Sequence, residues 1–210
     1  MNETCIFAFG CSTAITLLMG FLMKSLGLSS GNQLNRREAY FTVAITWIVF
    51  SVFGTIPLLL GGYCHTVGSA LFETMSGFTT TGATNINNVD ALPYSVLLWR
   101  SMMQWIGGLG IIFFTLTIMP SGGAGGVKLF SAEATGIAQE RLHPHIHTTA
   151  MWVWSLYLII TISCAVVYWL CGMNIFDSIN HALTTTATGG FSTHQEGVMF
   201  FKSPLIEYCM

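Results

Sequence analysis

Long apolar runs without charged residues alternate along the chain with shorter polar segments. A charged side chain at the centre of a bilayer costs at least ~2.5–3.5 kcal/mol, so helices that cross a membrane tend to exclude it. Crossing the ~30 Å hydrocarbon core takes about 20 apolar residues. Four runs fit this description: Cys5 to Met23, Phe41 to Gly62, Ser101 to Met119, and Thr148 to Cys171. We therefore predict four membrane-spanning helices, and at most the start of another from Val198, since Lys202, Pro204 and Glu207 interrupt that run.

The composition indicates that lipid is the main solvent of this chain. Only 8% of the 210 residues are charged, whereas about 25% is usual in a soluble domain. Hydrophobic residues make up 52%, and the mean hydropathy is +0.64. The net charge of -2 offers no basic surface to a nucleic acid. The six cysteines lack CxxC spacing and are interpreted as small buried hydrophobes. A cytosolic enzyme, a nucleic-acid-binding protein and a disordered tail are excluded.

Basic residues predict the orientation, because short cytoplasmic loops carry an excess of Lys and Arg. Lys24, Arg36 and Arg37 separate the first two runs, and Lys128 and Arg141 separate the third and fourth. Both of these connections should be cytoplasmic. The connections from Gly62 to Trp99 and from Gly172 to Gly197 are then external. Arg100, at the outer end of the third run, is the exception, and we expect it to snorkel to the interface.

The two external connections have the same plan. Each opens with a semi-apolar stretch of helical character, SALFETMSGF from Ser69 and FDSINHAL from Phe176. Each continues into Thr and Gly, in TTTGAT from Thr79 and TTTATGGFS from Thr184. Such segments are too short to cross and too apolar for open loops, which is typical of re-entrant loops. We predict a parallel repeat of span, short helix, Thr/Gly segment and span, in which Gly82 and Gly189, 107 residues apart, are equivalent.

Thr and Gly in this setting suit the coordination of a dehydrated cation. Potassium filters surround the ion with backbone carbonyls, glycine permits the backbone angles that align them, and the C-terminus of a short helix points its partial negative charge at the ion. The alternative is that Gly82 and Gly189 are helix C-caps in ordinary external loops. Glu73 and Asp177 near the helix starts are interpreted as favouring the helix dipole, with attraction of cations to the mouth as the second interpretation.

Three segments carry a family resemblance: FETMSGFTTTGAT, ALPYSVLLWRSMMQWIGGLGIIFFTLTIMP and FDSINHALTTTATGGFS. Together they resemble the TrkH family of potassium-uptake subunits in the Trk/Ktr/HKT cation transporter superfamily, over nearly the whole chain. The resemblance implies four repeats of span, pore loop and span around one pore, with two further spans in front. It also implies that Ser at the Gly82 position goes with sodium permeation. The filter positions that it implies are Thr80, Thr81, Gly82, Ala83, Thr84, Ala187, Thr188, Gly189, Gly190 and Phe191.

The resemblance also divides the chain into four parts. Residues 1–40 are a leading span and cytoplasmic loop, 41–120 the first repeat, 121–147 a cytoplasmic linker, and 148–210 a second repeat cut off in its last span. The third and fourth repeats are then missing, so an N-terminal-to-middle fragment is expected.

The expected function is potassium transport across the cell inner (plasma) membrane by a multi-pass protein, with K⁺ as the transported ion and no cofactor, nucleic acid or enzymatic activity. The alternative is a non-conducting fragment or truncated gene product. The expected partners are membrane lipid, the missing C-terminal repeats, a second copy in a homodimer and a cytosolic nucleotide-binding regulatory subunit. A membrane enzyme or receptor would need paired carboxylates, a His/Asp relay or a metal set within the spans, and the sequence has none.

Three weaker motifs have structural interpretations. Gly107, Gly108 and Gly110 in QWIGGLGI do not follow the GxGxxG pattern of a nucleotide loop, so we expect close helix packing against the pore loop. The histidines of HPHIH, from His143 to His147, are expected to form a polar turn rather than a metal site. His181 is expected to pack or hydrogen-bond, rather than to act directly in ion passage.

Overall fold

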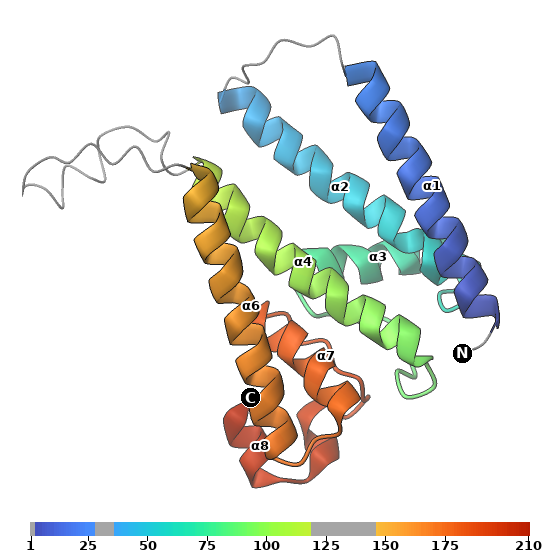
Figure 1. The fold of residues 1–210 in the computed structure, drawn as a ribbon. Helices are drawn as coiled ribbons and strands as arrows, with labels where there is room; N and C mark the ends of the chain where they lie inside the picture. The colour runs from blue at the N-terminus through green and yellow to red at the C-terminus, as the bar shows by residue number, and fades with distance from the viewer. Residues whose placement is uncertain (1–2, 28–35, 119–145) are drawn as a thin grey trace, which may run out of the picture.

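The structure is a computed structural model that describes residues 3–27, 36–118 and 146–210 (Figure 1). Within these ranges every regular element is a helix, as the all-α prediction requires. In chain order the helices are α1 (Glu3–Gly27), α2 (Arg36–Leu60), α3 (Val67–Phe78), α4 (Tyr94–Ile118), α6 (Ile146–Leu170), α7 (Ile175–Thr186), the 3-10 helix η2 (Gly197–Phe201) and α8 (Pro204–Cys209).

The long helices match the predicted spans. Three segments are apolar and long enough to cross a membrane, Cys5–Gly27, Phe41–Leu60 and Met151–Leu170, and they correspond to the first, second and fourth predicted spans. The third prediction falls in α4, which has 25 residues and begins earlier than expected, at Tyr94. At 1.5 Å per residue α4 is about 37 Å long, enough to cross ~30 Å of hydrocarbon. Its predicted end at Met119 lies outside the described residues.

The long helices turn apolar side chains outward, and the ends that adjoin the basic connections lie on the same side of the bundle. Phe21 is 76% exposed and Trp152 is 75% exposed, which suits helices whose solvent is lipid. Figure 1 shows α4 between the α1–α2 pair and α6. The C-terminal ends of α1 and α4 and the N-terminal ends of α2 and α6 lie at the same end of the bundle. These four ends adjoin the two basic connections, as the predicted topology requires; which side faces the cytoplasm stays a prediction.

Two short helices of 12 residues, α3 and α7, lie inside the bundle, as predicted. The helix α3 packs between α2 and α4, and α7 packs between α6 and α4. Each begins with a side-chain cap: the Thr66 hydroxyl accepts from the Ser69 N–H at 3.1 Å, and the Asn174 amide oxygen accepts from the Asp177 N–H at 2.8 Å. Such caps satisfy N–H groups that the first turn of a helix leaves without partners.

Glycines on α4 set how deep the short helices reach. A Cβ at Gly107 would overlap the carbonyl oxygen of Phe78, the last residue of α3. A Cβ at Gly108 would lie 3.1 Å from Cα of Ala187, which directly follows α7. Both short helices therefore end beside the middle of α4, as re-entrant helices do. The prediction of close packing at QWIGGLGI is confirmed.

The interior combines two small apolar clusters with a polar centre. Leu58, Cys64, Ala70 and Val96 form one cluster around α3, and Tyr168, Met173, Ala182 and Ile206 form the other around α7. The largest side chains with less than 2% exposure also include polar ones: Arg100, His181, Gln104, Glu73 and Asn180. A polar interior with an apolar exterior is what a path for ions through lipid needs.

The remaining predictions concern the linker and the chain's last run. Most of the 121–147 linker, with His143 and His145, lies outside the described residues, so the turn predicted there is not tested. Among the described residues there is no group of three or more His, Cys, Asp or Glu side chains placed to hold a metal. The run from Val198 forms η2 and the short α8, with Lys202 between them in a left-handed conformation (φ 47°).

Candidate filter loops

The segments after α3 and α7 have the same backbone conformation, 108 residues apart. Thr80 and Thr188 have φ of 56° and 54°, and Gly82 and Gly190 have φ of 77° and 83°. Their hydrogen bonds match as well: the Thr81 N–H donates to the Ser76 carbonyl at 2.9 Å, and the Gly189 N–H donates to the Thr184 carbonyl at 2.8 Å. The structure thus places an internal repeat where the sequence predicted one.

The register of the predicted repeat is wrong by one residue. The sequence predicts that Gly82 is equivalent to Gly189, but in the structure the equivalent of Gly82 is Gly190, and Gly189 corresponds to Thr81. The second loop carries two adjacent glycines, and only the one with positive φ occupies the position of Gly82. Ala187 is the C-cap of α7. The segment equivalent to Thr80–Thr84 is therefore 188–192, which leaves out Ala187 and adds Ser192.

The carbonyl oxygens of these loops are largely free. Where left-handed residues alternate with others, successive peptide groups face the same side, unlike those of an extended strand. Among the hydrogen bonds of the described residues, none is accepted by the carbonyls of Thr80, Thr81, Gly82, Thr188, Gly189 or Gly190. The Ala83 carbonyl differs, since the Ser76 hydroxyl donates to it at 2.6 Å. Apart from the Gly189 oxygen, which lies against Gly82, the loops thus present oxygens that could replace the water around a cation.

The two loops lie against each other, backbone to backbone. A Cβ at Gly82 would overlap the Gly189 carbonyl oxygen and lie 3.0 Å from its carbonyl carbon. Gln104 of α4 lies directly behind, where a Cβ at Gly189 would meet its side chain. Gly82 is therefore required twice, by its positive φ and by the approach of the second loop.

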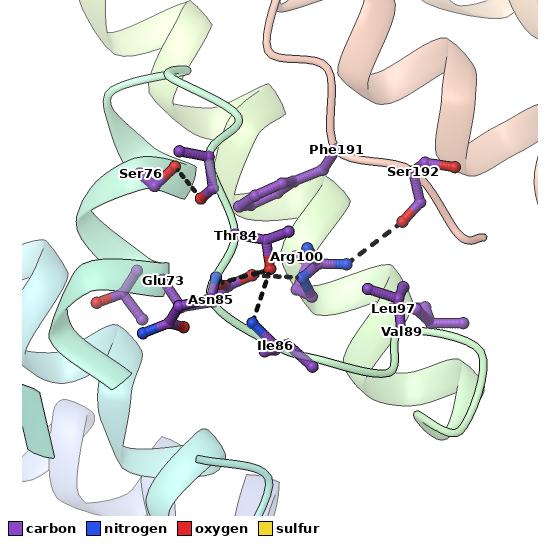
Figure 2. A network of polar contacts seen from close by, with 12 residues as sticks. Glu73, Ser76, Thr84, Asn85, Ile86, Val89, Leu97, Arg100, Phe191 and Ser192 are labelled. Atoms are coloured by element: carbon purple, nitrogen blue, oxygen red, sulfur yellow. Dashed lines mark hydrogen bonds and ion pairs between the residues drawn. The ribbon is translucent and has the colours of Figure 1, made fainter. Parts of the chain in front are cut away.

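A hydroxyl near the end of each loop is held by the short helix of the same repeat. The Thr84 hydroxyl donates to both carboxylate oxygens of Glu73 at 3.0 Å (Figure 2). At the equivalent place, Ser192 Oγ lies 3.2 Å from Nε2 of His181. His181 is 1% exposed, and its Nδ1 lies 2.9 Å from the Asp177 carbonyl oxygen. The hydrogen-bonding role predicted for His181 is confirmed, and its counterpart in the first repeat is Glu73.

The two acidic residues paired by the sequence are not equivalent. Asp177 lies in the first turn of α7, where its negative charge interacts favourably with the helix dipole, as predicted. Glu73 lies further along α3, whose first turn holds no acidic residue, so the dipole interpretation is wrong there. Glu73 is also 0% exposed and bonded to Arg100. Its charge is therefore enclosed, which argues against attraction of ions at an open mouth.

The prediction that Arg100 snorkels to the interface is wrong. Arg100 is 1% exposed, and its Nε donates to Oε1 of Glu73 at 2.7 Å (Figure 2). The prediction failed because it weighed a lone charge against lipid and did not consider a buried partner. The sequence held a signal, since Glu73 is the single charged residue between Glu38 and Asp90, and Arg100 the single one between Asp90 and Lys128. Two opposite charges in such stretches favour a pair.

A second polar contact joins the segments that follow the two loops. The His194 ring lies between two carboxylates, with Nδ1 at 3.0 Å from Asp90 and Nε2 at 3.2 Å from Asp177. The ring also stacks on Phe200, with centroids 3.5 Å apart. Asp90 follows the first loop and His194 follows the second, so this contact ties their outgoing ends together. Sequence reasoning did not single out His194.

Comparison with known proteins gives one consistent answer. The TrkH family, described as cation transport protein, matches residues 6–210. The chain is 39% identical over 202 residues to the Trk system potassium uptake protein TrkH of Halomonas elongata, and 37% identical over 201 residues to that of Escherichia coli strain K12. Each alignment covers 95% of this chain and 42% of the relative. These relatives are named as transport proteins, not as enzymes.

The fold of this chain is similar to that of a solved structure that is also named TrkH. The crystal structure of the potassium transporter TrkH from Vibrio parahaemolyticus matches with a TM-score of 0.85 at 34% identity, over 99% of this chain and 42% of that one. The chain thus spans about two fifths of the length of the proteins it resembles, and it is an integral membrane protein of their all-α polytopic fold. The chain belongs to the TrkH family of cation transport proteins.

Proposed function

We propose that this chain supplies two of the loops that line the path of K⁺ in a potassium-uptake transporter. The observation that carries the proposal is a set of backbone carbonyl oxygens, in two equivalent loops, that accept no hydrogen bond. The two loops lie against each other beside the middle of α4. The names of the relatives, Trk system potassium uptake proteins, support potassium as the ion. In the register given above, the filter segments are residues 80–84 and 188–192.

Passage of the ion in this proposal is diffusion without covalent chemistry. K⁺ loses its hydration shell and is coordinated by loop carbonyls. Their binding is strong enough for the ion to enter the path and weak enough for it to leave. The C-terminal ends of α3 and α7 both approach the loops, and each adds a partial negative charge that favours a cation. The charge of Glu73 is balanced by Arg100, so discrimination rests on the carbonyls rather than on a ring of carboxylates.

The rest of the path belongs, in this proposal, to the part of the full-length protein that corresponds to the remaining length of the relatives. The alternative, that the chain by itself is a non-conducting fragment, is compatible with the same loops. We place the transporter in the plasma membrane, and the relatives' name, Trk system, fits a transporter of several components. A homodimer and a cytosolic nucleotide-binding subunit are proposed on the resemblance alone, and co-purification of the full-length protein with such a subunit tests them.

The filter assignment is tested by Gly82→Ser in a hybrid transporter, in which this chain replaces the matching part of the Vibrio parahaemolyticus protein. The change places a Cβ at a residue with φ of 77° and against the Gly189 carbonyl. We expect weaker discrimination of K⁺ over Na⁺, because selectivity depends on the number and field of the coordinating carbonyls. The measurement is the ratio of K⁺ to Na⁺ uptake in cells that lack other potassium uptake.

Gly68→Ser is the matched control, since Gly68 lies on α3 with nothing within 4 Å of an added Cβ. If Gly82 were only a cap in an ordinary loop, Gly82→Ser would lower stability by roughly 1 kcal/mol or more, since the overlap with the Gly189 carbonyl adds to the cost of the positive φ, and would leave the uptake ratio unchanged. An unchanged ratio at normal expression would therefore remove the filter assignment.

A further inference from the structure

Arg100 links the two filter loops: it contacts the second loop directly and reaches the first through Glu73 of α3. It is the only charged residue on α4 and lies on the face of that helix that meets the loops (Figure 2). Its guanidinium has one partner on the first repeat and two on the second.

On the side of the first loop, the contact runs through Glu73. Arg100 Nε donates to Oε1 of Glu73 at 2.7 Å, and the same carboxylate accepts the Thr84 hydroxyl at 3.0 Å and the Asn85 N–H at 3.2 Å. Glu73 thus holds the end of the first loop, and Arg100 holds Glu73. A shift of the guanidinium would be transmitted to residues 84 and 85.

On the side of the second loop, the contact is direct. One terminal nitrogen of Arg100 donates to the Ser192 carbonyl at 3.3 Å, and the guanidinium carbon lies 4.2 Å from the centre of the Phe191 ring. One turn further along α4, the Gln104 oxygen accepts the Phe191 N–H at 3.1 Å. The helix α4 therefore fixes the second loop at two successive residues.

The chemistry of this contact requires arginine. A guanidinium has five donors in a rigid plane and can serve two acceptors while stacking on an aromatic face, whereas an ammonium is a single point charge. Burying two charges costs several kcal/mol per ion, and an apolar pair of similar volume is often as stable. A pair kept in a membrane interior at that cost points to a role beyond stability.

We propose that Arg100 is a positioning residue that fixes the distance between the two filter loops and thereby the discrimination between K⁺ and Na⁺. The proposal rests on the filter assignment made above. It assigns to Arg100 no contact with the ion. The competing explanation is that the Arg100–Glu73 pair only stabilises the fold.

Arg100→Lys in the hybrid transporter separates these explanations. Lysine keeps the charge next to Glu73, so the protein should remain folded, but it cannot also reach Ser192 and cover Phe191 with the same geometry. We expect the K⁺ to Na⁺ uptake ratio to fall about five-fold, the factor that corresponds to about 1 kcal/mol, with unchanged thermal stability in detergent. Ser101→Ala is the matched control, because Ser101 is equally buried but its hydroxyl bonds only within α4. It should change neither quantity.

A second variant guards against loss of folding. Arg100→Met alone leaves Glu73 charged and buried, so it should unfold more easily; adding Glu73→Gln removes that charge and should restore the folded yield. The double variant should still discriminate poorly between K⁺ and Na⁺, because the Ser192 carbonyl has lost the guanidinium donor of Arg100. Restored stability together with a normal uptake ratio, or a normal ratio in Arg100→Lys, would overturn the proposal. If Gly82→Ser, run in parallel, changes the ratio while the Arg100 variants do not, the filter assignment survives and only the role of Arg100 fails.

Discussion

Replacing Gly107 by alanine should push α4 away from the end of the first short helix. The added Cβ would overlap the Phe78 carbonyl oxygen and lie 2.7 Å from its carbonyl carbon and 3.0 Å from its Cα. All three atoms belong to the backbone, so no change of rotamer relieves the overlap. Moving the carbonyl carbon to 3.4 Å, where ordinary contact begins, takes a shift of about 0.7 Å, and the carbonyl oxygen, which lies closer to the added Cβ, needs a larger one. Thr80 follows two residues later, so the loop has to move as well.

The expected loss of stability follows from two opposed effects. Overpacking typically costs about 1–3 kcal/mol, and a rigid backbone partner favours the upper part of that range. Alanine gains about 1 kcal/mol over glycine in the interior of a helix. The net prediction for Gly107→Ala is a loss of about 1–2 kcal/mol in the free energy of unfolding.

Gly20→Ala gives the matched comparison, because Gly20 lies in α1 with nothing within 4 Å of an added Cβ. It keeps the gain in helix propensity without the clash and should leave stability unchanged or raise it by up to about 1 kcal/mol. Both variants of the chain are measured by denaturant unfolding in the same detergent. If Gly107→Ala proves as stable as Gly20→Ala, the close approach of α4 to Phe78 is refuted.

Two further predictions concern register and topology. Gly190→Ala should disturb the K⁺ to Na⁺ uptake ratio of the hybrid transporter through its φ of 83°, although its Cβ meets nothing within 4 Å; an unchanged ratio would argue against its equivalence to Gly82. Cysteines introduced near Gly123 should react with impermeant thiol reagents only from the cytoplasmic side, and ones near Asn88 only from outside. The opposite labelling would reverse the orientation, so that the loops would dip into the membrane from the cytoplasmic side.

The sequence was sufficient for the elements and insufficient for the contacts between them. Charge-free runs predicted the spans, because lipid penalises charge wherever a helix crosses. The short helices and their Thr/Gly loops were also predicted, since this local pattern has few other solutions in a membrane. The register failed at Gly189 and Gly190, because either glycine satisfies a sequence comparison and only φ separates them. The partner of Arg100 was missed because a contact across 27 residues depends on how α3 packs against α4.

The two neighbouring glycines of α4 also bear on the order in which the protein assembles. Gly107 faces the end of α3 and Gly108 faces the end of α7, so one helix of the first repeat serves as a wall for both. During synthesis α4 is made before α7, and until α7 inserts, Arg100 lacks Ser192 and Phe191, and that side of α4 is bare. An intermediate with only the first repeat would keep the Arg100–Glu73 ion pair but would leave the buried guanidinium without its contacts to Ser192 and Phe191. We therefore expect the first loop to be fixed fully only after the second repeat has inserted, so that the two loops fold as one unit.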